Sequence, residues 1–153
     1  MDVNDLVCDT LEEFLMECVG NKIEEVSELP KMLKDIYYLA DKQELIEQTT
    51  GCEMIDIDDS FVEKCDLSGN EIYIQYKIDF ILQTFTESEV IWRVQGSAEV
   101  EFSIPDTSQA DWSVFDDPDS DFFEQYEKYK PLVHFHQITY TDIECDTLRM
   151  YAD

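Results

Sequence analysis

Apolar residues recur at every second position along two stretches of the chain that a short polar segment separates. Between residues 71 and 86 these positions are Ile72, Ile74, Tyr76, Ile78, Phe80 and Leu82, which alternate with Tyr73, Gln75, Lys77 and Asp79. Between residues 90 and 104 they are Trp92, Val94, Gly96, Ala98, Val100, Phe102 and Ile104. A period of two residues is typical of a strand with one buried face. We therefore expect a long β-hairpin over residues 71–86 and 90–104, with the rest of the fold built around it.

A loop over residues 87–89 sets the expected register of this hairpin. It places Phe80 opposite Gly96 on the apolar face, so that a large side chain meets a small one. On the other face Lys77 lies opposite Glu99, an opposite-charge pair that favours this alignment. A slip by one residue would turn the whole apolar set toward water.

Apolar residues at helical spacing mark the N-terminal third of the chain. They predict an amphipathic helix over residues 4–19, with Asn4 as its N-cap and Gly20 as its end. A second helical region is expected from Pro30, a residue that suits the first turn of a helix. A shorter helix is expected to restart at Asp41.

The remaining segments carry mixed patterns. We expect an edge-like strand over residues 52–65, a turn over 66–70, an acidic loop over 106–121, a short helix capped by Asp121, and one or more strands over 132–150. These elements predict an α+β fold with N-terminal helices packed on an antiparallel sheet.

The expected organisation is a single domain over residues 1–153. It is helical over 1–50 and mainly β over 52–153, and the acidic loop and short helix occupy 106–130. The length of 153 residues is enough to bury a substantial core.

Charge is the unusual feature of the composition. The chain holds 37 acidic and 10 basic side chains, a formal net charge of −27. Excess carboxylates must cover much of the surface, and their mutual repulsion opposes compaction. The sign of this charge disfavours nucleic acid or an anionic membrane as a partner, whereas it favours a basic protein surface or a cation.

Five cysteines are spread along the chain with no C-x-x-C pair, at positions Cys8, Cys18, Cys52, Cys65 and Cys145. We expect them to be reduced and mostly buried. The N-terminus lacks the basic region of a signal peptide, and no apolar run approaches the length of a membrane span. We therefore expect a cytoplasmic protein.

Three groups of residues in the sequence are candidates for a metal site. Asp117, Asp119 and Asp121 begin like a calcium loop, but Phe122 and Lys128 stand where an EF-hand needs glycine and glutamate. A solvated acidic turn that caps a helix is the better interpretation.

The second group is Asp56, Asp58 and Asp59, which lack a phosphate-binding loop beside them. The third is His134 and His136, which share one face of a strand and would need a further ligand such as Asp142, Glu144 or a cysteine. We interpret the two histidines as ordinary strand residues. No catalytic motif is recognisable, so we expect neither a catalytic residue nor a cofactor.

The leading hypothesis is a non-enzymatic inhibitor that presents carboxylates where a nucleic acid presents phosphates. It would occupy a basic groove of a nuclease or another nucleic-acid-binding protein. In general composition the chain resembles phage-encoded DNA-mimic inhibitors of restriction or CRISPR nucleases. The acidic loop also holds aromatic rings, which pair well with arginine and lysine. The predicted partner-binding residues are Asp9, Glu12, Glu13, Asp56, Asp58, Asp59, Asp111, Trp112, Asp116, Asp117, Asp119, Asp121 and Glu124.

Two alternatives remain open. One is an accessory or immunity-type module that binds a partner protein through its sheet edge and aromatic loop. The other is a metalloenzyme that uses the two histidines and nearby carboxylates.

Overall fold

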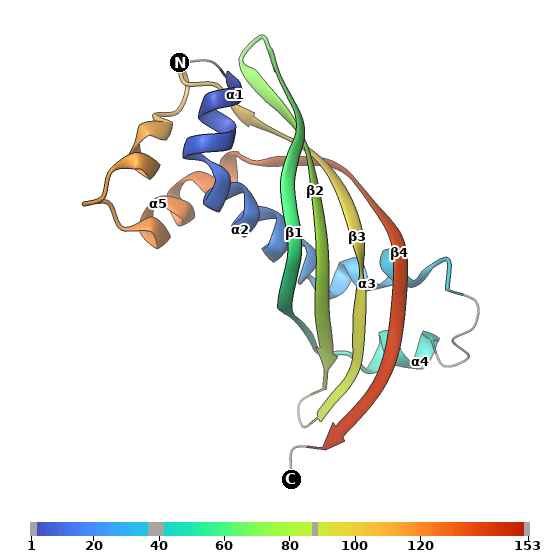
Figure 1. Cartoon of the computed structure of the whole chain (residues 1–153). Helices are drawn as coiled ribbons and strands as arrows, with labels where there is room; N and C mark the ends of the chain where they lie inside the picture. Colours follow the sequence, from blue (N-terminus) through green and yellow to red (C-terminus); the bar gives the residue numbers. More distant parts are fainter. Residues whose placement is uncertain (1–2, 37–41, 87–88, 152–153) are drawn as a thin grey trace. The chain divides into compact units, whose positions relative to one another are not determined.

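A computed structural model of the chain describes residues 3–36, 42–86 and 89–151. Its central element is a sheet of four strands: β1 (Gly51–Ser68), β2 (Glu71–Phe85), β3 (Glu89–Pro105) and β4 (His134–Tyr151). Each strand lies beside its neighbour in the sequence, in the order β1-β2-β3-β4 (Figure 1). Helices precede this antiparallel meander, which confirms the predicted α+β class.

Short helices and the turns between them make up the remainder of the described chain. Those before the sheet are α1 (Val3–Asp5), the π-helical turn η1 (Leu6–Thr10), α2 (Glu12–Ile23), the 3₁₀ turn η2 (Val26–Glu28), α3 (Leu29–Leu33) and α4 (Lys42–Gln48). Between β3 and β4 lie the 3₁₀ turn η3 (Trp112–Asp116), α5 (Phe122–Tyr129) and the 3₁₀ turn η4 (Lys130–Leu132).

The predicted hairpin is confirmed as β2 and β3. All six apolar residues predicted for the inner face of β2 are buried. The side chain of Gln75 donates a hydrogen bond to Glu101 across 3.5 Å, and that of Ser97 donates to Asp79. Both pairs are directly opposite positions in the predicted register, so these bonds support it. The expected ion pair between Lys77 and Glu99 is absent. These two residues are both described, and their charged groups lie more than 4.0 Å apart.

The prediction of one helix over residues 4–19 is wrong. The π turn η1 interrupts it, and α2 continues past Gly20 to Ile23. The side chains of Val19 and Ile23 are fully buried, so core packing extends the helix through the glycine. Asn4 does not act as an N-cap, since it lies inside α1, and its side-chain oxygen lies 2.9 Å from Sγ of Cys65.

The other two predicted helices are present in part. Pro30 occupies the first turn of α3, as expected, but α3 ends at Leu33. The predicted continuation through Tyr37, Leu39 and Ala40 lies outside the described residues, as does Asp41. The helix expected after it is confirmed as α4.

The turn before the hairpin is shorter than predicted. Only Gly69 and Asn70 lie outside the strands, because Asp66 and Leu67 belong to β1. Gly69 has a φ of 62°, a left-handed conformation that glycine adopts without a steric penalty. A two-residue loop of this kind joins antiparallel strands tightly.

The final segment forms one strand, and its inward-facing positions do not keep a period of two. The less exposed residues are Phe135, Ile138, Tyr140, Ile143 and Cys145. Successive members of this set are three, two, three and two residues apart. A step of three arises where one extra residue in a strand moves the following side chains to the opposite face. Asp142, with a φ of 55°, marks the second shift. These shifts explain why the sequence of this strand alternates poorly.

By its internal contacts the chain divides into two compact units. Unit 1 comprises Met1–Val19, Phe61–Lys77 and Glu99–Ile138, and unit 2 comprises Gly20–Ser60, Ile78–Ala98 and Thr139–Asp153. The expectation of one domain over 1–153 stays a prediction. Among the described residues no helix has both the length and the apolar character needed to cross a membrane.

Candidate protein-interaction surface

Nine of the predicted partner-binding acids lie in unit 1, on two segments that pack against each other. The first segment carries Asp9, Glu12 and Glu13, and the second carries Asp111, Asp116, Asp117, Asp119, Asp121 and Glu124. All nine side chains are exposed. The hydroxyl of Thr10 donates a hydrogen bond to the carboxylate of Asp116 over 3.1 Å, which joins the segments directly. We call these nine residues the unit 1 acidic surface.

A cluster of aromatic rings beneath this surface holds the two segments together. Phe14 of α2 is fully buried, and its ring centroid lies 5.5 Å from that of Trp112 and 4.9 Å from that of Phe115. Tyr126 of α5 contacts Phe14 at 5.8 Å, and Tyr129 contacts Trp112 at 5.1 Å. Offset and edge-to-face ring pairs at these distances are favourable. The rings therefore fix α2, η3 and α5 as one support for the carboxylates.

Several acids of the second segment also order its backbone. Asp111 caps η3 by accepting hydrogen bonds from the backbone N–H and the hydroxyl of Ser113. These bonds from Ser113 hold the pKa of Asp111 below its ordinary value. Asp117 accepts from the N–H of Asp119, and Asp121 caps α5 as predicted. The loop is thus locally ordered although its composition is highly polar.

Basic side chains are scarce around this surface. Between Arg93 and Lys128 the sequence has ten acidic residues and no basic one. Lys128 lies over the ring of Tyr129, with 5.4 Å between its ammonium group and the ring centroid. Lys130 forms an ion pair with Glu127 at 3.0 Å, and its pKa is raised by that carboxylate. The nine acids therefore keep most of their negative field.

The aromatic contact predicted from the sequence has to be corrected. Trp112 is only 1% exposed, and its indole N–H donates to the backbone oxygen of Pro105 over 2.9 Å. It is a core residue in this conformation and is not available to a partner. Phe123 in α5 is instead 69% exposed, beside Asp121 and Glu124. The sequence around Trp112 and Phe123 does not indicate which of the two side chains is buried.

The other three predicted acids, Asp56, Asp58 and Asp59, lie on β1 in unit 2. All three are exposed. The strand is at one end of the sheet order, where charged side chains discourage pairing with a further strand. This gives the three acids a local role that does not require a partner.

The residues considered for a metal site are not gathered around a common point. In the described part of the chain no three side chains of His, Cys, Asp or Glu are grouped so that they could hold a metal ion. His136 stacks on Tyr73, with ring centroids 5.8 Å apart and planes 29° apart. The metalloenzyme hypothesis therefore has no ligand set among these residues.

The fold creates one pairing that no sequence motif indicated. The hydroxyl of Ser103 and Nε2 of His136 lie 2.9 Å apart, although 33 positions separate them in the sequence. A serine beside a histidine is the arrangement of many nucleophiles. Ser103 is fully buried, however, so its oxygen does not reach a substrate in this conformation.

The negative charge is spread over both units. Unit 1 has 19 acidic and 4 basic side chains, a formal charge of −15, and unit 2 has 18 and 6, a formal charge of −12. What distinguishes unit 1 is the packing of two acidic segments around a common aromatic cluster. No protein-family model, no curated protein and no solved structure matches the chain.

Proposed function

We propose that this protein is a non-enzymatic, cytoplasmic binding protein that occupies a basic groove of a nucleic-acid-binding protein, such as a nuclease, and so inhibits it. The observation that supports this best is the unit 1 acidic surface. Its nine exposed carboxylates are carried by two segments that contain no basic residue and that an aromatic cluster holds in place.

Such a protein would inhibit its partner by competing with the phosphates of a nucleic acid. Duplex DNA carries one negative charge per ~1.7 Å of helix axis, and its protein partners provide lysine and arginine for those charges. Carboxylates fixed on a folded surface offer the same groove a negative field without the cost of ordering a flexible chain. An exposed ring such as Phe123 adds a contact for arginine and lysine side chains.

The test is a binding titration of the purified protein against a nuclease with a basic groove, over a series of salt concentrations. We expect affinity to fall steeply with salt, and duplex DNA to compete for the site. Binding that is indifferent to both salt and DNA would contradict the proposal.

A set of variants assigns the binding to the acidic surface. Changing Asp116, Asp117 and Asp119 together to asparagine should weaken binding and reduce its salt dependence. The matched control removes three exposed charges elsewhere, with Asp35→Asn, Glu44→Gln and Glu47→Gln. Equal effects of the two triple variants would indicate that net charge alone, and no particular surface, governs the interaction.

An observation on β1 favours the second candidate, an accessory or immunity-type module that binds through a sheet edge. This end strand exposes three apolar side chains: Ile55 is 41% exposed, Phe61 44% and Leu67 53%. Apolar side chains on an edge strand are typical of a surface that another chain covers. In this case Phe61→Ser would abolish binding, and the asparagine variant of the acidic surface would leave it intact.

A further inference from the structure

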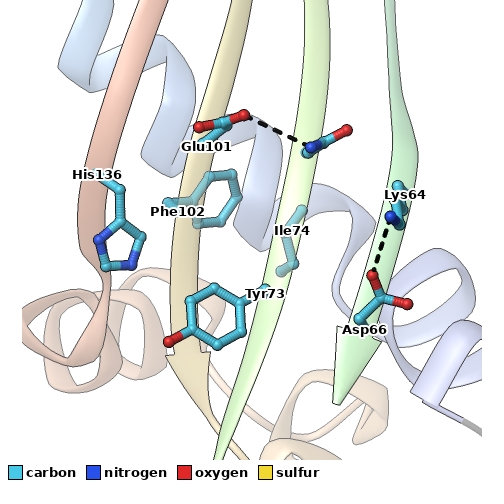
Figure 2. Close-up of a pocket in the computed structure, with 8 residues that line it drawn as sticks. Lys64, Asp66, Tyr73, Ile74, Glu101, Phe102 and His136 are labelled. Atoms are coloured by element: carbon cyan, nitrogen blue, oxygen red, sulfur yellow. Dashed lines mark hydrogen bonds and ion pairs between the residues drawn. The ribbon is translucent and has the colours of Figure 1, made fainter. Parts of the chain in front are cut away.

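We propose that a hollow on the outer face of the sheet in unit 1 binds a guanidinium group. The hollow has a volume of about 280 Å³. All four strands contribute to it, and the residues around it are Lys64, Asp66, Tyr73, Ile74, Gln75, Glu101, Phe102 and His136 (Figure 2). This site is separate from the unit 1 acidic surface, and the inference does not depend on the function proposed above.

One wall of the hollow is a pair of aromatic side chains on either side of a small residue. Tyr73 on β2 and His136 on β4 flank Ser103 on β3, and their rings stack with centroids 5.8 Å apart. The hydroxyl of Ser103, 2.9 Å from Nε2 of His136, fixes the imidazole. Tyr73 remains 44% exposed. Its ring thus offers a preformed surface for stacking.

Two of the polar side chains of the hollow, Asp66 and Glu101, are carboxylates that attract a cation. Lys64 and Asp66 form an ion pair at 3.5 Å, so they largely offset each other. Among the described residues, Glu101 receives one hydrogen bond, a long one of 3.5 Å from the side-chain amide of Gln75 (Figure 2). A carboxylate has about four acceptor positions, so Glu101 retains capacity for a further donor. Lys64, Asp66 and Glu101 together give the lining one negative charge in excess.

These features select one class of ligand. Phosphates and carboxylates are disfavoured by Glu101 and by the net charge of −27. A guanidinium group is planar, so it can stack on the ring of Tyr73 while it donates two parallel hydrogen bonds to Glu101. A lysine ammonium is more strongly hydrated and cannot make this planar, bidentate contact. The arginine side chain is therefore the expected ligand.

The experiment is a titration followed by amide chemical shifts in the whole protein. The probe is N-acetyl-L-arginine amide, and the comparison compounds are the corresponding citrulline and lysine amides. Citrulline keeps the planar shape of the arginine head group but is uncharged. We expect saturable shifts at residues of the hollow with the arginine compound, and affinity about tenfold weaker or more for the other two.

Two variants and a control test whether these chemical shift changes arise from binding in the hollow. Glu101→Gln should weaken arginine binding by about tenfold or more, since it removes the charge-assisted bonds. Tyr73→Leu should weaken it by removing the stacking surface. Glu99→Gln is the control, because Glu99 is exposed two residues away on the same strand and does not line the hollow. Each variant is also checked for an unchanged unfolding midpoint.

The following results support or overturn the proposed guanidinium site. Weakening by Glu101→Gln with an unaffected Glu99→Gln supports the site. The proposal is overturned if the arginine compound produces no saturable shifts in the hollow, if citrulline binds as well as arginine, or if the two glutamate variants behave alike.

Discussion

The phenolic hydroxyl of Tyr140 donates a 2.8 Å hydrogen bond to the carboxylate of Glu28, which is only 1% exposed. The other oxygen of this carboxylate lies 3.0 Å from the ammonium group of Lys31 and 4.0 Å from that of Lys22. A buried charge is tolerated only when partners replace its lost hydration. Lys31 is thus the main cationic partner of this internal acid, since Lys22 lies closer to Glu25, at 2.9 Å.

Tyr140→Phe should destabilise the protein by about 1–3 kcal/mol, because one oxygen of Glu28 loses its donor while it stays buried. The measurement is a urea unfolding curve. Tyr73→Phe serves as the control, since the ring of Tyr73 is 44% exposed, and it should change stability by less than about 0.5 kcal/mol. Equal midpoints for both variants would show that the bond to Glu28 contributes nothing measurable.

Much of the fold was predictable because β2 and β3 are inner strands with one face packed on a core. Their apolar residues keep a period of two from Ile72 to Ile104, so strand type, bounds and register all follow. The end strands were harder to predict. No hydrophobic residue of β1 is fully buried, and the inward positions of β4 shift near Asp142. Edge strands have fewer neighbours to fix a pattern.

The candidate surface was predictable in its charges but not in its aromatic contact. Carboxylates at positions such as Asp116 and Asp119 remain exposed in almost any fold because burial without partners is costly. Trp112 is buried against Phe14, a residue far from it in the sequence. Contacts between residues far apart in the sequence have no local pattern to reveal them.

Gly96 and Gly20 should respond oppositely to alanine. A Cβ atom on Gly96 would contact Cδ1 of Ile143 and lie 3.1 Å from the backbone oxygen of Thr141. We expect Gly96→Ala to destabilise the protein by about 1–3 kcal/mol. Gly20 lies inside α2 with no atom within 4 Å of an added Cβ, so Gly20→Ala should stabilise it by about 0.5–1 kcal/mol. Thermal unfolding of both variants tests this, and a shift of the same sign in both would contradict it.

The aromatic cluster of unit 1 should be sensitive to loss of Phe14. This fully buried ring contacts Trp112, Phe115 and Tyr126, so Phe14→Ala should cost about 3–5 kcal/mol through the cavity that it leaves. Phe123→Ala removes the same side chain from a site that is 69% exposed, and its cost should stay below about 0.5 kcal/mol. Urea midpoints of the two variants give the comparison, and similar losses would show that Phe123 is also part of the core.

Two buried thiols should make stability fall in alkaline solution. Burial raises the pKa of Cys18 and of Cys145 from 9.0 to about 12. The folded state therefore retains protons that the unfolded state releases, and this stabilisation, complete below about pH 9, is lost as the pH rises toward 12.

Cys145→Ala should flatten the decline of unfolding free energy between about pH 9 and pH 11, measured by urea titration at each pH. The variant also removes a thiol group from a position that is only 8% exposed, so its stability near neutral pH falls as well. The effect of thiol ionisation is therefore taken from the pH dependence of the unfolding free energy alone. Cys8→Ala is the control, since it also removes a thiol, but one that is exposed. A slope equal to that of the parent protein in both variants would rule out a contribution from the thiol of Cys145.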